Sequence, residues 1–222
     1  LKSCRLYSVI IAYKNSVHCF PLFLYNRFMN KYDIELLNKS GLPITVLDTV
    51  DSTNNFVKSR LLEDMADGLR KTPFAVLADT QSAGRGRYER SFFSPEGAGI
   101  YLSYAYRHEY SEPELLEVTT KVAEFILPVL QSHSSEELWI KPINDIYKGD
   151  RKILGILVER VDNPYSRGDY ALVIGIGINC FSGLCSDIPD DISDKIGFLE
   201  PDCSRSELSL EFLEVLHKHF DE

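Results

Sequence analysis

Two long β-type segments joined by a short turn constrain the fold of this 222-residue chain more than any other feature. Ile153–Arg160 and Tyr170–Ile176 are rich in Ile, Leu and Val, and Asn163–Asp169 between them contains Pro, Ser, Arg and Gly. Apolar runs separated by such a cluster are typical of neighbouring strands in a sheet. The length fits one domain, or one domain with an appendage.

The other expected elements do not follow a strict β-α-β alternation. We expect further strands at Ile44–Leu47, Phe74–Ala78, Ile100–Tyr106 and Leu138–Ile140. Apolar residues at helical spacing predict helices after residue 54, at Glu114–Leu130 and at Glu207–Phe220. Because the helices separate runs of strands, we predict an α+β fold with a mixed, mainly antiparallel sheet flanked by helices.

Residues 1–43 are interpreted as an N-terminal extension that need not be ordered throughout. Its apolar runs Val9–Ala12 and Phe20–Tyr25 are too short to span a bilayer, and no secretory signal or DNA-binding domain is evident. We expect residues 1–28 to be dispensable, and we expect no membrane partner.

Charge and cysteine content narrow the function classes further. The net charge of −9 makes nucleic acid an unexpected partner, because nucleic-acid binding usually needs a basic face. The five cysteines are scattered and odd in number, so we expect reduced thiols and a cytoplasmic location rather than disulfides. Cys180 and Cys185 have no second pair of ligands nearby, which argues against a structural zinc site there.

A loop rich in glycine and arginine follows the strand at 74–78. Gly84 and Gly86 alternate with Arg85 and Arg87, and Arg90 follows closely. Glycine lets the backbone approach a ligand, and arginine suits carboxylate and phosphate groups. The pattern predicts an anion-binding loop, with a solvated hairpin loop as the alternative. It is not a P-loop, because no Gly-Lys-Ser/Thr follows.

Three further polar segments interrupt the apolar pattern. Residues 51–54 precede a predicted helix, where they would cap it, and the helix start could also offer N–H groups to an anion. Lys141, Asn144 and Asp145 follow one strand, and Lys152 opens another, where it could also snorkel at the edge. No Ser/His/Asp triad stands out, so a cationic site with one or two carboxylates suits a phosphate reaction with a divalent cation.

Five ordered motifs spanning about residues 44–220 resemble those of the biotin protein ligases, also called biotin–[acetyl-CoA-carboxylase] ligases. They are Asp-Ser-Thr-Asn at 51–54, Gln-Ser-Ala-Gly-Arg-Gly-Arg at 81–87 with Ser-Pro-Glu-Gly at 94–97, Lys-Pro-Ile-Asn-Asp at 141–145, Lys-Ile-Leu-Gly-Ile-Leu-Val-Glu at 152–159, and Gly-Ile-Gly-Ile-Asn at 175–179. The chain departs from the family at Glu89, commonly Gly, at Phe92, often Trp, and at Pro142-Ile143, which replaces Trp-Pro.

The resemblance implies a class II aminoacyl-tRNA-synthetase-like catalytic domain over residues 44–222, without the small C-terminal β-barrel of many members. It implies a ligase that uses ATP and Mg²⁺ to activate biotin to biotinoyl-5′-AMP, releasing pyrophosphate. The partner it implies is a biotin carboxyl carrier domain of acetyl-CoA carboxylase or a related carboxylase, and the chain would act as a monomer or homodimer.

The resemblance also implies roles for individual residues. Biotin would be bound by Ser52, Thr53, Asn54, Gln81, Lys152 and Gly155. The adenylate would be bound by Gly84, Arg85, Gly86, Arg87, Asn144 and Asn179. Lys152 and Arg87 would be the catalytic residues, and Asp145 is the candidate ligand for Mg²⁺.

Two alternatives remain open at this point. A lipoate–protein ligase shares the fold and the reaction type, although Gly-Arg-Gly-Arg together with Lys-x-x-Gly-Ile-Leu-Val-Glu favours biotin. A biotin-responsive repressor would need a basic DNA-reading element, which residues 1–43 do not show.

Overall fold

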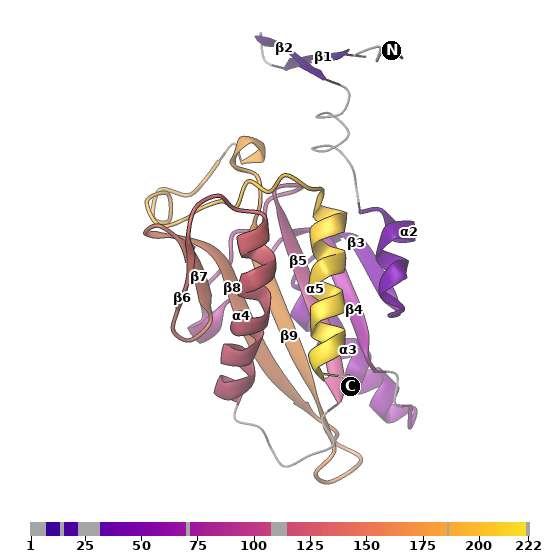
Figure 1. Cartoon of the computed structure of the whole chain (residues 1–222). Helices are drawn as coiled ribbons and strands as arrows, with labels where there is room; N and C mark the ends of the chain where they lie inside the picture. Colours follow the sequence, from indigo (N-terminus) through magenta and orange to yellow (C-terminus); the bar gives the residue numbers. More distant parts are fainter. Residues whose placement is uncertain are drawn as a thin grey trace.

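A computed structural model of the chain describes residues 8–13, 16–21, 32–69, 72–107, 115–185 and 187–220, with side chains from Tyr32 onward except that of Glu89. Within these ranges, seven strands form one sheet in the order β3-β4-β5-β9-β8-β7-β6 (Figure 1). β3 runs parallel to β4, and the other neighbours are antiparallel. The predicted α+β class with a mixed, mainly antiparallel sheet is therefore confirmed.

The strands of this sheet are β3 (Ile44–Val50), β4 (Phe74–Gln81), β5 (Gly99–Arg107), β6 (Leu138–Lys141), β7 (Asp145–Lys148), β8 (Arg151–Asp162) and β9 (Tyr170–Asn179). The described helices are α2 (Ile34–Leu37), α3 (Thr53–Ala66), α4 (Leu115–Ser132) and α5 (Arg205–Phe220). Two further strands, β1 (Ser8–Tyr13) and β2 (Ser16–Pro21), form a separate antiparallel pair. Every described element of 7 residues or more in the large sheet and its helices was predicted from the sequence, but the 4-residue elements β7 and α2 were not.

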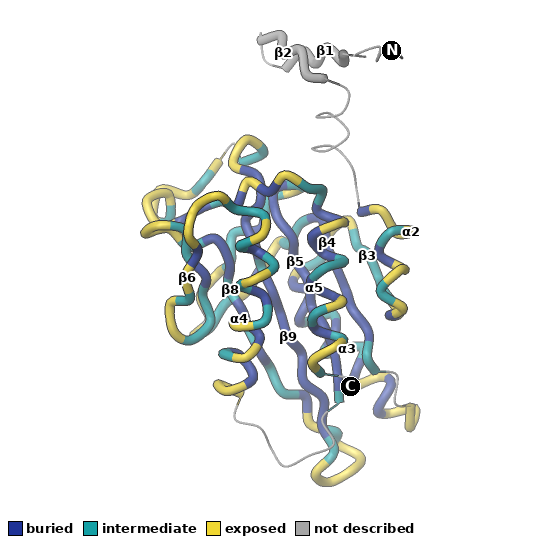
Figure 2. The backbone as a smooth tube through the Cα atoms, viewed as in Figure 1, coloured by how far each residue is buried: buried dark blue, intermediate teal, exposed yellow. Residues whose placement is uncertain are grey.

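Successive side chains of each strand point to opposite faces of the sheet, and the two faces are covered differently. One face carries Leu154, Ile156 and Val158 of β8 with Leu172, Ile174, Ile176 and Ile178 of β9, and it packs under α2, α4 and α5. We call this the α4/α5 face. In Figure 1, α4 and α5 lie side by side over it, and in Figure 2 the strands beneath them are buried along most of their length.

The opposite face, the α3 face, is covered by α3 over only part of its length. Val57, Leu61 and Met65 of α3 pack there against a second apolar cluster that includes Val161 and Val173. Beyond the start of α3, the next positions on this face of β9 are Gly175 and Gly177. At these glycines the side chains of Asn54 and Phe92 lie directly against the sheet.

Residues before 44 contribute to the core. Tyr32, Leu37 and Leu42 belong to the apolar cluster under α5, and Leu37 is fully buried. The backbone N–H of Asp33 donates to Ser206 Oγ of α5 at 2.8 Å. We therefore propose that the compact domain includes residues 32–43 and does not begin at 44.

A buried ion pair joins the start of α5 to the end of β4. Arg205 lies 2.6 Å from Asp79, and both side chains are at most 11% exposed. Arg205 also donates to the carbonyl oxygen of Gly99, the first residue of β5, at 3.2 Å. These contacts fix the end of β4, two residues before Gln81, against the helix layer.

Among the described residues, no helix combines the length and apolar character that a membrane crossing requires. The described cysteines, Cys180, Cys185 and Cys203, are all free thiols, as the sequence predicted. The predictions for Cys4 and Cys19 lie outside the described side chains.

Leu37→Ala should lower the free energy of unfolding by about 2–5 kcal/mol, because it removes a fully buried side chain from the core. Ile34→Ala is the matched control, since Ile34 is 54% exposed in the same short helix and its loss should change stability by less than about 0.5 kcal/mol. Urea unfolding of both variants measures the difference. Equal effects would show that residues 32–43 are not part of the core.

Candidate active site

A cleft opens on the α3 face beyond the start of α3, and with its mouth it encloses about 420 Å³. The start of α3, the loop after β4, and strands β8 and β9 supply most of its walls. Its lining residues are Ser52, Thr53, Asn54, Gln81, Arg85, Gly86, Phe92, Leu102, Asn144, Lys152, Gly155, Ile156, Leu157, Gly175, Ile176 and Gly177.

One end of the cleft is polar and uncharged. Ser52 is the N-cap residue of α3, but its side chain makes no capping hydrogen bond. Gln81 takes over this role, because its Oε1 accepts from the N–H of Thr53 at 2.9 Å and from the Thr53 hydroxyl at 3.2 Å. The Thr53 N–H is thus satisfied by a neutral amide, so it is not the open anion site that the sequence suggested. Gln81 is itself held by Ser94 Oγ at 2.9 Å.

Asn54 connects the start of α3 to three strands. Its Oδ1 accepts a hydrogen bond from Ser103 Oγ on β5 at 2.5 Å, and its Nδ2 donates to Glu159 of β8 at 2.8 Å. A Cβ atom at Gly175 of β9 would overlap the Asn54 amide. Glycine at 175 therefore allows the buried Asn54 side chain to lie directly against the sheet.

Glu159 pairs with two positively charged side chains beside the cleft. Its carboxylate lies 2.8 Å from Lys58 Nζ and accepts two hydrogen bonds from Arg85, at 2.8 and 2.9 Å. Partial burial opposes ionisation, but the hydrogen bonds from Lys58 and Asn54 and the nearby positive charges hold the pKa of Glu159 below its usual value. This charge cluster joins α3, β8 and the glycine–arginine loop.

The other end of the cleft is cationic. Lys152 Nζ lies 2.7 Å from Asp145 Oδ1 of β7, and the lysine side chain is 31% exposed. A Cβ atom at Gly155 would lie 2.9 Å from Nζ, so glycine at 155 leaves room for the ammonium group. Asn179 Nδ2 lies 3.5 Å from the Lys152 carbonyl oxygen and helps to position its backbone.

The glycine–arginine loop folds back on itself through backbone hydrogen bonds. The N–H of Gly86 donates to Arg90 O at 2.7 Å, and that of Phe92 donates to Gly84 O at 2.8 Å. The Phe92 ring lies where a Cβ atom at Gly177 would be, 2.6 Å from the nearest ring carbon. The loop thereby places an aromatic ring as one wall of the cleft.

The structure brings most predicted site residues together. Six predicted biotin-binding residues and three adenylate-binding residues line the cleft: Ser52, Thr53, Asn54, Gln81, Lys152, Gly155, Arg85, Gly86 and Asn144. Gly84 is packed beneath Phe92 and Ser94, and Asn179 and Asp145 adjoin Lys152 without lining the cleft. Arg87 lies 5.1 Å above the Tyr88 ring and borders a neighbouring groove with Leu115 and Leu116. The structure thus places nine of the predicted residues around one cleft, and the roles of all of them remain predictions.

The sequence analysis assigned no role to Glu159, Phe92, Ser103 or Lys58. Glu159 was quoted only within a motif, and Phe92 only as a departure from the family. The partners of Glu159 lie 74 and 101 positions away along the chain, so no local pattern could reveal the charge cluster.

The pH dependence of the stability of Glu159→Gln tests the charge cluster around Glu159. The folded-state pKa is below the unfolded value of about 4.3, so ionised Glu159 stabilises the fold fully above that value. The contribution is lost as the pH falls through the lower folded-state pKa. We expect Glu159→Gln to be less stable than wild type at pH 7, and the difference to shrink as the pH falls below about 4.

Urea unfolding from pH 3 to pH 7 measures this difference. Glu63→Gln, at an exposed position of α3, controls for the loss of one negative charge. A difference between wild type and Glu159→Gln that stays constant across this range would contradict the assignment.

Known proteins resemble this chain over the segments that form the cleft. The sequence model of the biotin/lipoate A/B protein ligase family matches residues 46–179. The bifunctional ligase/repressor BirA of Escherichia coli K12 is 36% identical over 154 residues, which cover 66% of this chain and 45% of BirA. BirA of Bacillus spizizenii is 33% identical over 155 residues, covering 69% of this chain and 45% of that protein. The chain thus spans less than half the length of these curated relatives.

Among solved structures, the biotin protein ligase of Aquifex aeolicus in complex with biotin and ATP is 26% identical, with a TM-score of 0.65, covering 81% of this chain and 70% of that one. The biotin–acetyl-CoA-carboxylase synthetase of Helicobacter pylori, 23% identical with a TM-score of 0.59 over 80% of this chain and 74% of that one, shares the fold. With a family match over more than half of its length and a cleft built from the matched segments, this chain belongs to the biotin/lipoate A/B protein ligase family.

Proposed function

We propose that the chain is an ATP-dependent biotin protein ligase, which activates biotin to biotinoyl-5′-AMP and transfers the biotinoyl group to a lysine of a biotin carboxyl carrier domain. Family membership, the similarity to BirA and the Aquifex aeolicus structure with biotin and ATP support this function. ATP and reduced thiols are both consistent with a cytoplasmic reaction.

The observation that carries the proposal is the division of the cleft into two ends. Gln81, Asn54 and Thr53 offer neutral donors and acceptors at one end, where the charge of Arg85 is paired with Glu159, and Lys152 offers positive charge at the other. Biotin has the same division, with a neutral ureido head that hydrogen-bonds and a carboxylate at the end of an apolar chain. The glycines of β8 and β9 let the side chains that would contact biotin, Asn54, Phe92 and Lys152, lie close to the sheet.

The first half-reaction joins two anions, and this explains the cations of the cleft. A biotin carboxylate oxygen attacks the α-phosphorus of ATP, the bond from that phosphorus to the β-phosphate oxygen breaks, and pyrophosphate leaves. Lys152 would lie between the carboxylate and the α-phosphate, where negative charge accumulates in the transition state. Arg85 would have to exchange part of its contact with Glu159 for the phosphate.

In the second half-reaction, the amine of the carrier lysine attacks the biotinoyl carbonyl carbon, AMP leaves and the amine loses a proton. Before this step the mixed anhydride must be protected from water. Arg87 would reach the adenylate if the loop carrying it moved over the cleft, where Gly84 and Gly86 permit such a change. Asn144 and Asn179 would support the nucleotide side of the cleft.

The donor set at Asp145 fits Mg²⁺, which commonly binds one or two protein carboxylates together with substrate phosphates. Asp145 faces Lys152 at the cationic end, so its carboxylate could hold an ion that arrives with ATP. Such an ion would neutralise charge on the phosphates.

The proposal is tested by incubating the chain with ATP, Mg²⁺ and a biotin carboxyl carrier domain, with either biotin or lipoate, and measuring the carrier's mass. We expect the carrier to gain the mass of one biotinoyl group and no lipoyl group. Transfer of lipoyl alone would assign the chain to the other branch of the family. No transfer of either group would contradict the proposed ligase activity.

Lys152→Met should lower the rate of biotin-dependent pyrophosphate release about 10²–10³-fold, because it removes a charge that acts mainly in the transition state. Lys148→Met is the matched control, since Lys148 lies on the adjacent strand β7 and pairs with Glu136, outside the cleft. A near wild-type rate in Lys152→Met would contradict the role of Lys152.

A further inference from the structure

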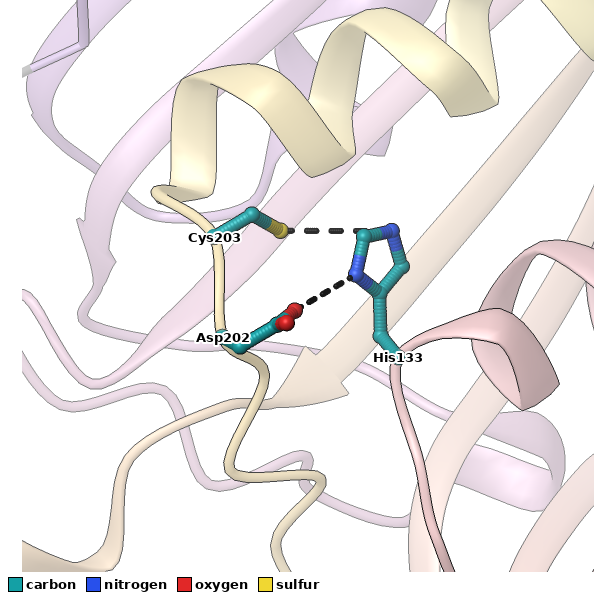
Figure 3. Close-up of side chains that lie close together, drawn as sticks. All are labelled: His133, Asp202 and Cys203. Atoms are coloured by element: carbon teal, nitrogen blue, oxygen red, sulfur yellow. Dashed lines mark hydrogen bonds and ion pairs between the residues drawn. The ribbon is translucent and has the colours of Figure 1, made fainter.

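A second group of chemistry-bearing side chains lies away from the cleft, where the end of α4 meets the start of α5. His133 directly follows α4, Asp202 and Cys203 precede α5, and Glu211 lies on α5. Figure 3 shows the side chains of Asp202 and Cys203 directed toward the His133 ring from the same side. None of these residues lines the cleft, and α4 and α5 cover the other face of the sheet.

The two ring nitrogens of His133 have different surroundings. Nδ1 lies 3.2 Å from Asp202 Oδ1. Nε2 lies 3.0 and 3.2 Å from the Glu211 carboxylate oxygens and 4.0 Å from Cys203 Sγ. The His133 side chain is only 13% exposed, so its ring is held in this orientation by packing as well as by polar contacts.

These distances approach the spacing of ligands around one tetrahedral zinc ion. Zn–N and Zn–S bonds of about 2.1 and 2.3 Å place the nitrogen and sulfur about 3.6 Å apart, and a carboxylate oxygen about 3.4 Å from the nitrogen. Ligand atoms of His133, Asp202 and Cys203 lie within 4.8 Å of one another. Shifts of a few tenths of an ångström would bring Cys203 Sγ and the Glu211 oxygens to these distances from Nε2, and the two side chains would also have to approach each other.

The contact at Nδ1 within this cluster matches the usual surroundings of a metal-bound histidine. A histidine that binds a metal through one nitrogen usually donates the other N–H to a carboxylate, which fixes the tautomer and the ring orientation. Asp202 occupies that position for His133. The backbone next to Cys203 is also held in place, because Ser204 and Glu207 form a capping box with hydrogen bonds of 2.7 and 3.2 Å.

We propose that His133 Nε2, Cys203 Sγ and the Glu211 carboxylate bind one zinc-like divalent transition metal ion, with Asp202 orienting the histidine. An imidazole, a thiolate and a carboxylate favour zinc over the harder ions magnesium and calcium. With water as the fourth ligand, the ion would tie the end of α4 to the start of α5. The site is structural and is separate from the proposed ligase chemistry.

The experiment uses the full chain, treated with a chelator, kept reduced with a phosphine, and titrated with ZnCl₂ against a chromophoric chelator. We expect an ion bound through Cys203, with Tm raised by about 5–10 °C at a hundredfold excess of zinc over Kd. Co²⁺ in place of zinc should give a thiolate-to-cobalt charge-transfer band in the near ultraviolet.

Variants locate the ion on the chain. Cys203→Ser should abolish the charge-transfer band and the zinc-dependent rise in Tm, and Glu211→Gln should weaken zinc binding at least tenfold. Asp202→Asn should weaken it about 10–100-fold. Cys185→Ser is the matched control, because Cys185 is a partly exposed thiol outside the cluster and its loss should leave all three readouts unchanged.

Two results would overturn the proposal. One is the absence of a zinc-dependent rise in Tm in wild type, which would leave His133 held by two carboxylates without a metal ion. The other is zinc binding and a cobalt band that Cys203→Ser and Glu211→Gln leave unchanged, which would place the ion elsewhere on the chain. Neither result bears on biotin transfer, so the two proposals fail separately.

Discussion

The alternation of isoleucine and glycine along β9 is the constraint on which both the core and the cleft depend. Ile174, Ile176 and Ile178 point to the α4/α5 face and are buried there. Gly175 and Gly177 point to the opposite face, where any Cβ atom would overlap Asn54 or the Phe92 ring. Because successive side chains of a strand alternate between faces, one short segment closes the core on one side and opens a binding surface on the other.

The charges of the cleft are arranged in two linked groups on that open surface. Glu159 holds Lys58 and Arg85 near the start of α3, and Asp145 holds Lys152 at the far end. Each carboxylate keeps a cation directed along the sheet, which reduces the reorganisation needed when anionic substrates bind. The buried pair of Asp79 and Arg205 supports the same end of β4 from the helix layer. The positions of these cations are thus determined largely by contacts between segments that are far apart in the sequence.

Local patterns were enough to predict most of the fold and much of the cleft. The apolar periodicity located β8, β9, α4 and α5, and the motifs located Asn54, Gln81 and Lys152, because such signals lie within a few neighbouring residues. Three features could not be predicted from such local patterns, because each joins residues that are far apart in the sequence. The capping of α3 by Gln81 joins residues 28 positions apart, the Glu159 cluster joins three segments, and the burial of Leu37 depends on α5. The His133 group was missed for the same reason, since 70 positions separate it from Cys203.

The most direct test of the central claim, a cleft with one neutral and one cationic end, is calorimetric titration with biotin and with its neutral carboxamide. The account predicts that Lys152→Met weakens binding of biotin by about 10–100-fold, as loss of a charge-assisted hydrogen bond would, and leaves binding of the carboxamide nearly unchanged. Equal losses for both ligands would contradict it, because Lys152 would then not distinguish the charged end of the ligand. Unchanged binding of both would place the carboxylate outside the reach of Lys152.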